Sequence, residues 1–141
     1  MRRLLALGFI AVLSACGDST SPPPFPAVAG TYRMDITFSD FPPSVVNASG
    51  TITITQASRN APDLTGSASV IVTIGGDNVA VTQLTNASVT EAGVIRFRLT
   101  PPNSSSTWGF DGTVTASGMS GTHVLVGSTS SFPGTFTATR Q

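Results

Sequence analysis

The chain has 141 residues, of which 40% are hydrophobic and 10% are charged, and its formal net charge is zero. Its basic residues are all arginine, and seven acids balance them, so the basic surface that binds nucleic acid phosphates is missing. The single cysteine and single histidine exclude a disulfide within the chain and any metal site built from several of these residues.

Residues 1–15 have the three parts of a secretory signal. Two arginines near the start are followed by the apolar run 4–13, and the small residues Ser14 and Ala15 precede Cys16. About ten helical residues cover roughly half of a ~30 Å hydrocarbon core, so the run is too short to span a membrane. An ordinary secretory signal cleaved after Ala15, with Cys16 incidental, is one interpretation of this pattern.

The order of these parts resembles the signal of bacterial lipoproteins, in which a box of small residues ends in a cysteine. The resemblance implies that cleavage after Ala15 makes Cys16 the first residue of the mature chain, carrying a thioether-linked diacylglycerol and an acylated, palmitate-type amine. Several acyl chains anchor far more firmly than one myristoyl chain, whose binding is reversible. Asp directly after the cysteine would favour the inner membrane. Because Gly17 stands there and Asp18 follows, we expect the outer membrane.

Residues 16–27 are predicted to be the lipidated cysteine and a proline-rich tether. The stretch 18–26 contains four prolines. Extended polyproline rises about 3.1 Å per residue, so some ten residues would hold the next domain roughly 30 Å from the bilayer. The alternative is a proline motif that binds a partner domain. Residues 28–141 then form one domain that is long enough to bury a core.

Eight segments after the tether alternate between apolar and polar residues, which is the period of a half-buried strand. The predicted strands are 30–38, 50–57, 64–74, 79–90, 94–100, 107–116, 119–126 and 134–140. The fourth is irregular, and a bulge is expected near Gln83. No helical periodicity follows the signal segment. We therefore expect an all-β fold.

The sixth and seventh strands are predicted to form a hairpin with Ser117-Gly118 as its two-residue turn. In that register Gly112 faces His123, and small residues oppose large ones on the inner face. A shift by one residue would turn every side chain to the other face. His123 is thus expected inside, as a polar group in a ligand chamber or as a core histidine with one hydrogen-bond partner.

Eight antiparallel strands in sequence are typical of an up-and-down meander that closes into a small barrel and so removes its edges, with a β-sandwich as the alternative. Gly30-Thr31-Tyr32 opens the first strand, and Arg140 ends the last. This arrangement is similar to that of the calycins (lipocalins, fatty-acid-binding proteins and avidins), in which a Gly-x-Trp is covered by Arg or Lys from the barrel's end. The resemblance implies a cup-shaped barrel closed by Tyr32 and Arg140, with a chamber for a ligand.

In a meander the connections alternate between the two ends of the barrel. The longer ones gather at the end away from the tether: 39–49, 101–106 and 127–133. Phe41, Trp108 and Phe132 lie in or next to these loops. They are expected either to line the mouth of a ligand chamber or to cap the core.

We expect no enzymatic activity, because the sequence shows no convergent acid, base and nucleophile. Ser120 and His123 are three residues apart on one strand, so their side chains leave opposite faces and form no triad with Asp111. The stretch 75–78 lacks the glycine spacing and helix of a phosphate loop, and no calcium-loop motif is present. No cofactor and no metal ion are predicted.

The sequence therefore predicts a protein of the bacterial cell envelope that is anchored to the membrane through Cys16. Its barrel is expected to bind a small apolar ligand without catalysing a reaction. An eight-stranded barrel is just wide enough to be filled by its own side chains or to hold one small ligand. The alternative is a structural or interaction lipoprotein with a filled barrel. The sequence identifies neither the ligand nor a protein partner.

Overall fold

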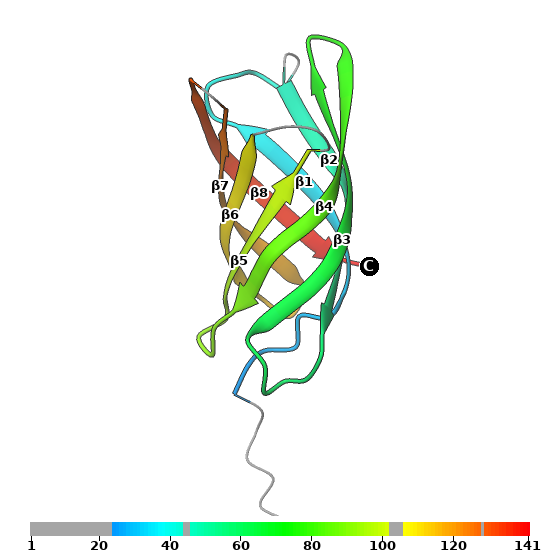
Figure 1. Cartoon of the computed structure of the whole chain (residues 1–141), viewed down its shortest axis with the longest axis vertical. Coiled ribbons are helices and arrows are strands. Elements are labelled where there is room, and N and C mark those ends of the chain that lie inside the picture. The colour runs from blue at the N-terminus through cyan, green and yellow to red at the C-terminus, as the bar shows by residue number, and fades with distance from the viewer. Residues whose placement is uncertain (1–23, 44–45, 102–105, 128) are drawn as a thin grey trace, which may run out of the picture.

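The computed structural model describes residues 24–43, 46–101, 106–127 and 129–141, and the predicted signal and lipidation site lie outside them. The described residues form eight strands: β1 (Gly30–Phe38), β2 (Val46–Gln56), β3 (Asp63–Ile74), β4 (Asp77–Val89), β5 (Val94–Thr100), β6 (Thr107–Val114), β7 (Gly118–Val126) and β8 (Ser131–Arg140). Each strand pairs antiparallel with the next, and β8 pairs with β1, so the sheet closes into an up-and-down barrel (Figure 1). The all-β barrel prediction is confirmed.

The barrel interior is built by the predicted alternation of apolar and polar residues. In β1, Tyr32 and Met34 are buried whereas Arg33 and Asp35 are exposed. Three aromatic rings from β5, β6 and β8 fill the middle of the barrel. Phe97 and Phe110 stack at a centroid distance of 4.7 Å, and Phe136 meets both edge-on at 5.8 and 5.3 Å.

Several strands are longer than predicted. β2 begins at Val46 rather than at residue 50, because its ladder with β3 continues to the pair Val46–Ile74. β8 begins at Ser131 rather than at residue 134, because it still pairs with Val126 there. The connections at the two ends of the barrel therefore differ less in length than the sequence indicated.

The predicted register of the β6–β7 hairpin is wrong by two residues. The facing pairs are Val114–Met119, Gly112–Gly121, Phe110–His123 and Trp108–Leu125. Thr115 N–H donates to the carbonyl of Gly118 at 2.7 Å, so Ala116 and Ser117 make the turn. Gly118 belongs to β7, where a Cβ would collide with the Ala138 carbonyl of β8. The inner face is still as predicted, because a shift of two residues keeps every side chain on its face.

β4 is irregular, as predicted. Its pairing with β3 shifts on both sides of the pair Ser67–Gln83, and its pairing with β5 shifts between Thr85 and Ser88. Asn86 lies within this second irregularity with a positive φ of 47°. Such a bulge bends the strand and changes the direction of a side chain.

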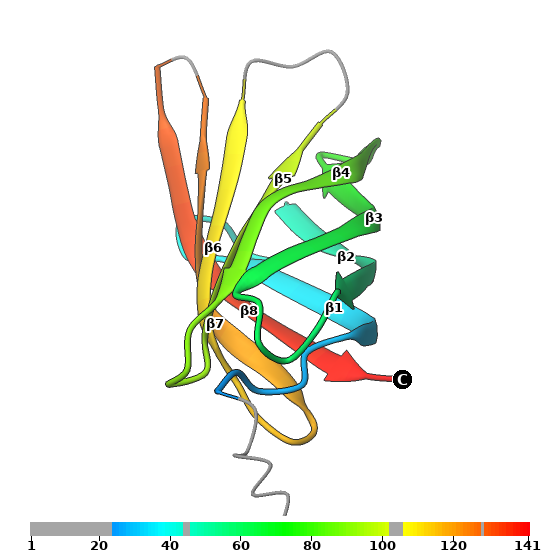
Figure 2. The same cartoon turned by 60° about the horizontal axis from the view of Figure 1, so that its bottom comes forward.

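The two ends of the barrel are built differently. The closed end holds the β2–β3, β4–β5 and β6–β7 connections, and the N-terminal segment 24–29 (blue) runs across it in both views (Figures 1 and 2). The open end holds the other four connections, among them the Gly75-Gly76 turn between β3 and β4. The segment before β1 therefore approaches the closed end.

Candidate functional site

An apolar pocket of about 170 Å³ lies at the open end of the barrel. Its lining consists only of hydrophobic side chains: Phe38, Phe41, Val46, Ile74, Leu125 and Phe132. Phe41 comes from the β1–β2 connection and Phe132 from the start of β8, and their ring centroids are 5.6 Å apart. The remaining wall is supplied at the strand ends of β1, β2, β3 and β7 by Phe38, Val46, Ile74 and Leu125.

A second pocket of about 230 Å³ adjoins the first, since Ile74 and Leu125 line both. The other lining residues are Val72, Val79, Val81, Pro101, Ser106 and Trp108. A cavity of about 150 Å³ lined by apolar groups is sufficient for benzene, so each pocket has room for one small apolar molecule or for part of a longer one. We define these two pockets together as the mouth.

The floor of the mouth is an aromatic cluster around one buried polar chain. Trp108 is fully buried, and its Nε1 donates to His123 Nδ1 at 2.9 Å. His123 is only 2% exposed, and its Nε2 lies 3.0 Å from the carbonyl oxygen of Thr37. The Phe38 ring packs on both, at centroid distances of 5.6 Å from Trp108 and 4.9 Å from His123. His123 therefore has two hydrogen-bond partners rather than the one expected.

These contacts fix the protonation state of His123. An indole nitrogen is a donor only, so Nδ1 must accept, and the ring proton must be on Nε2, which donates to the Thr37 carbonyl. Burial lowers the pKa of His123 below its usual value, and the hydrogen bond to Thr37 opposes this only in part. The neutral imidazole is thus the form of His123 that makes both hydrogen bonds in the floor.

Gly134 of β8 makes room for this chain of hydrogen bonds. A Cβ at Gly134 would collide with the imidazole of His123 and with the carbonyl oxygen of Thr37. The imidazole therefore passes over a residue without a side chain and reaches β1 from β7. Because Gly134 has no side chain, these hydrogen bonds can connect β6, β7 and β1 at the base of the mouth.

The predicted closing pair, Tyr32 and Arg140, meets at the closed end. The two residues face each other across β1 and β8, and the guanidinium carbon of Arg140 lies 5.5 Å from the Tyr32 ring centroid. Arg140 Nη2 also donates to the carbonyls of Ala27 and Ala29, at 3.3 and 2.6 Å. The Tyr32 hydroxyl donates to the carbonyl of Val28 at 2.8 Å. The pair thus holds the N-terminal segment over this end.

The predicted mouth residues are only partly brought together. Phe41 and Phe132 face each other at the first pocket, whereas Trp108 lies in the floor and reaches the second pocket. Sequence reasoning missed Val46, which was placed in a loop, and it did not single out Phe38 or Leu125. Their inward positions at strand ends, next to the loops, were the signal that could have identified them.

Other constellations do not assemble into a site in the described residues. His123 is buried inside, whereas Ser120 and Asp111 are exposed on the outer face. Asp111 accepts from Arg96 at 2.6 Å. Within the described ranges, no group of three or more potential metal ligands is present, and no helix is long and apolar enough to cross a membrane.

No protein-family model matches the chain, and no curated protein matches it. Among solved structures, the chain is similar to a fluorescence-activating β-barrel protein, EF1p2_mFAP2b bound to DFHBI. The TM-score is 0.58 at 15% sequence identity, over 80% of this chain and 93% of that chain. At this identity the likeness concerns the barrel fold alone.

Proposed function

We propose that this protein binds a small apolar ligand in the mouth of its barrel and catalyses no reaction. The observation that carries the proposal is the first pocket, whose lining is entirely apolar and includes the facing rings of Phe41 and Phe132. Pockets that bind small molecules are concave and mostly apolar, with few polar groups. The barrel below the mouth is filled by its own aromatic rings, so the ligand would be held at the end and not in the centre.

The proposal includes a membrane anchor at Cys16 in the outer membrane of a bacterial cell. It is supported by the lipoprotein-like signal, and by the approach of the N-terminal segment to the closed end, which would leave the mouth directed away from the bilayer. Intact-mass measurement of the native protein should give the mass of residues 16–141 plus a diacylglycerol and an acyl group. Cys16→Ser should abolish processing. A mature Cys16→Ser protein that still partitions into membranes would contradict the anchor.

Ligand binding is tested with N-phenyl-1-naphthylamine, a neutral apolar dye whose fluorescence rises in apolar surroundings. Trp108 is the chain's only tryptophan and lines the mouth, so its emission should change on dye binding. Phe132→Asp should abolish the dye signal, because a carboxylate would be placed in an apolar pocket, whereas Phe132→Leu should retain it. Val94, which is 36% exposed at the closed end, provides the control Val94→Asp, which should bind dye like the wild type.

A structural or interaction protein without a ligand is the second candidate. It is favoured by apolar side chains exposed on β3, β4 and β7 near the open end, namely Ile74, Val79, Val124 and Val126. A protein partner that covers these residues would bind equally well to Phe132→Leu and to the wild type, and would require no ligand. Absence of dye binding together with capture of an envelope protein through this end would decide for it.

A further inference from the structure

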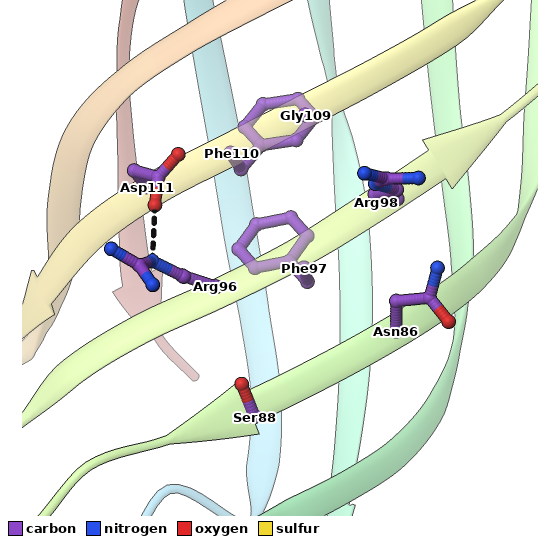
Figure 3. A pocket seen from close by; sticks show the side chains of 8 residues that line it. All are labelled: Asn86, Ser88, Arg96, Phe97, Arg98, Gly109, Phe110 and Asp111. Atoms are coloured by element: carbon purple, nitrogen blue, oxygen red, sulfur yellow. Dashed lines mark hydrogen bonds and ion pairs between the residues drawn. The ribbon is translucent and has the colours of Figure 1, made fainter.

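A groove of about 420 Å³ lies on the outer face of β4, β5 and β6, and it does not share a residue with the mouth (Figure 3). Its lining residues are Asn86, Ser88, Arg96, Phe97, Arg98, Gly109, Phe110 and Asp111. Arg96, Arg98 and Asp111 project outward from their strands, whereas Phe97 and Phe110 are buried beneath them. The groove is thus a polar surface over a rigid, stacked aromatic layer.

Neither packing nor backbone conformation in the described fold requires a glycine at position 109. A Cβ at Gly109 would meet no atom within 4 Å, and its φ is not positive. At Gly112, Gly121 and Gly134, in contrast, a Cβ would come too close to backbone or ring atoms of neighbouring strands. A glycine inside a strand weakens it, and it often marks a place where a ligand approaches closely. The absent side chain keeps the centre of the groove open.

The bulge in β4 brings an amide to the same place. Asn86 is the one non-glycine residue with positive φ among the described residues, and it lies opposite the Arg98 region of β5. Figure 3 shows the Asn86 and Arg98 side chains on the same side of the groove, with the Arg96–Asp111 pair on the other. A bulge that directs a side chain is a typical feature beside binding sites.

Of the two arginines in the groove, Arg96 is engaged in an ion pair with a described residue and Arg98 is not. Arg96 is engaged by Asp111, with 2.6 Å between Nε and Oδ1. The guanidinium of Arg98 makes no hydrogen bond or ion pair with a described residue, and it faces Gly109 across β5 and β6. A guanidinium is a planar fork that matches a carboxylate through two parallel hydrogen bonds.

We propose that this groove binds a ligand through a single carboxylate, which sits over Gly109 and pairs with Arg98, with the Asn86 amide as a further donor. Asp111 is fixed at the rim, so the groove has one net positive charge and disfavours a phosphate dianion. The carboxylate belongs either to a small free acid or to the C-terminus of a peptide. This site is separate from the mouth, and its test is independent of the ligand proposed there.

The test is NMR titration of the ¹⁵N-labelled full chain in detergent, with two carboxylates and one matched neutral analogue. N-acetylglycine mimics a peptide C-terminus, lactate is a small free acid, and N-acetylglycinamide lacks the charge. N-acetylglycine should shift the amide signals of Arg98 and Gly109 saturably, and N-acetylglycinamide should not. Saturation by lactate as well would identify a free acid as sufficient, whereas a response to N-acetylglycine alone would identify a peptide terminus.

Variants separate the groove from general charge attraction. Arg98→Gln and Gly109→Val should each weaken N-acetylglycine binding by about tenfold or more, the first by removing the fork and the second by filling the space. Gly109→Val should not lower the melting temperature, since a Cβ at this position meets no atom within 4 Å and β-branched residues suit strands. Arg33 is an exposed strand arginine outside the groove, so Arg33→Gln is the matched control and should bind like the wild type.

Four results would overturn the proposal. The first is the absence of any saturable shift at Arg98 and Gly109 with either acid. The second is equal weakening by Arg33→Gln, which would indicate unspecific attraction. The third is stronger binding of inorganic phosphate than of N-acetylglycine, which would contradict the carboxylate assignment. The fourth is normal binding by Arg98→Gln, which would contradict the pairing of the carboxylate with that residue.

Discussion

The closed end of the barrel is covered by the N-terminal segment, which hydrogen bonds from and to side chains hold in place, whereas the rim of the open end surrounds a pocket with apolar side chains. At the closed end, Arg59 Nε donates to the Phe25 carbonyl at 3.1 Å, and Val28 N–H donates to Gln56 Oε1 at 3.2 Å. At the open end, Phe41 and Phe132 touch ring to ring. Hydrogen bonds fix one geometry, while apolar contacts tolerate exchange of one partner for another.

This difference assigns a separate role to each end. The closed end is covered by its own N-terminal segment, since Val28 is fully buried and Arg140 donates two hydrogen bonds to carbonyls of this segment. The rim of the open end leaves apolar surface without a covering segment among the described residues. Below that rim, hydrogen bonds connect Trp108, His123 and the Thr37 carbonyl, so the mouth has an adaptable rim over a fixed floor.

The largest expected effect comes from removing the floor. Trp108→Ala should lower the free energy of unfolding by about 3–5 kcal/mol, because it leaves a cavity and also removes the donor to His123. Trp108→Phe should cost less, since it keeps a ring but removes the indole N–H. Urea unfolding followed by circular dichroism measures both. Equal stability of Trp108→Ala and the wild type would show that the floor is not a packed layer.

The next effect breaks the closed end. Arg140→Ala removes two hydrogen bonds to the N-terminal segment and the contact with the Tyr32 ring, so we expect a loss of about 1–2 kcal/mol. Hydrogen exchange should accelerate at Val28, while the mouth residues should be unaffected. Arg33→Ala, an exposed arginine on β1, serves as the control and should change stability little. Unchanged exchange at Val28 would mean that Arg140 does not hold this segment.

A smaller effect is expected from pH and should arise at the floor. The pKa of His123 is lowered in the folded state, so the unfolded chain takes up a proton first as the pH falls below 6.5. The contribution of neutral His123 to the free energy of unfolding is complete above pH 6.5. It is lost as the pH falls towards the folded-state pKa, at up to about 1.4 kcal/mol per pH unit. Unfolding free energies of the wild type and of His123→Gln, measured from about pH 7.5 to about pH 5.5, test the sign. A wild-type slope no steeper than that of the variant would contradict it.

The smallest effect on stability is expected at the rim. Phe41→Leu removes one ring of the pair with Phe132 but keeps an apolar side chain, so it should cost about 1 kcal/mol or less. Its affinity for N-phenyl-1-naphthylamine should change more than its melting temperature. Thermal melting and dye titration on the same sample give the comparison. A large loss of stability would place Phe41 in the core of the fold rather than at its rim.

The strand pattern could be predicted from the sequence, but the pairing details could not. Alternation in 30–38 and 94–100 predicted these two strands with their correct bounds, because a half-buried strand leaves a period of two. Gly118 was assigned to a turn, since glycine is common there, yet it is required where β7 approaches Ala138 of β8. The sequence alone does not distinguish a glycine that a turn requires from one that a neighbouring strand requires.

The candidate site was predictable only in outline. Phe41 and Phe132 could be identified from their neighbouring loops, and His123 from the inner face of its strand. The Trp108–His123 hydrogen bond joins residues on neighbouring strands, so it depends on a register that the sequence did not specify correctly. The groove around Gly109 was not predicted, because three strands and a bulge assemble it.

The sequence by itself determined the eight-strand order, the faces of the strands and the aromatic content of the interior, because local alternation encodes which side of a strand is buried. Only the tertiary structure decided the register of β6 and β7, the position of the N-terminal segment over the closed end and the hydrogen-bond partners of His123. Those features depend on contacts between residues that are far apart in the chain, and such contacts leave no local periodicity to detect.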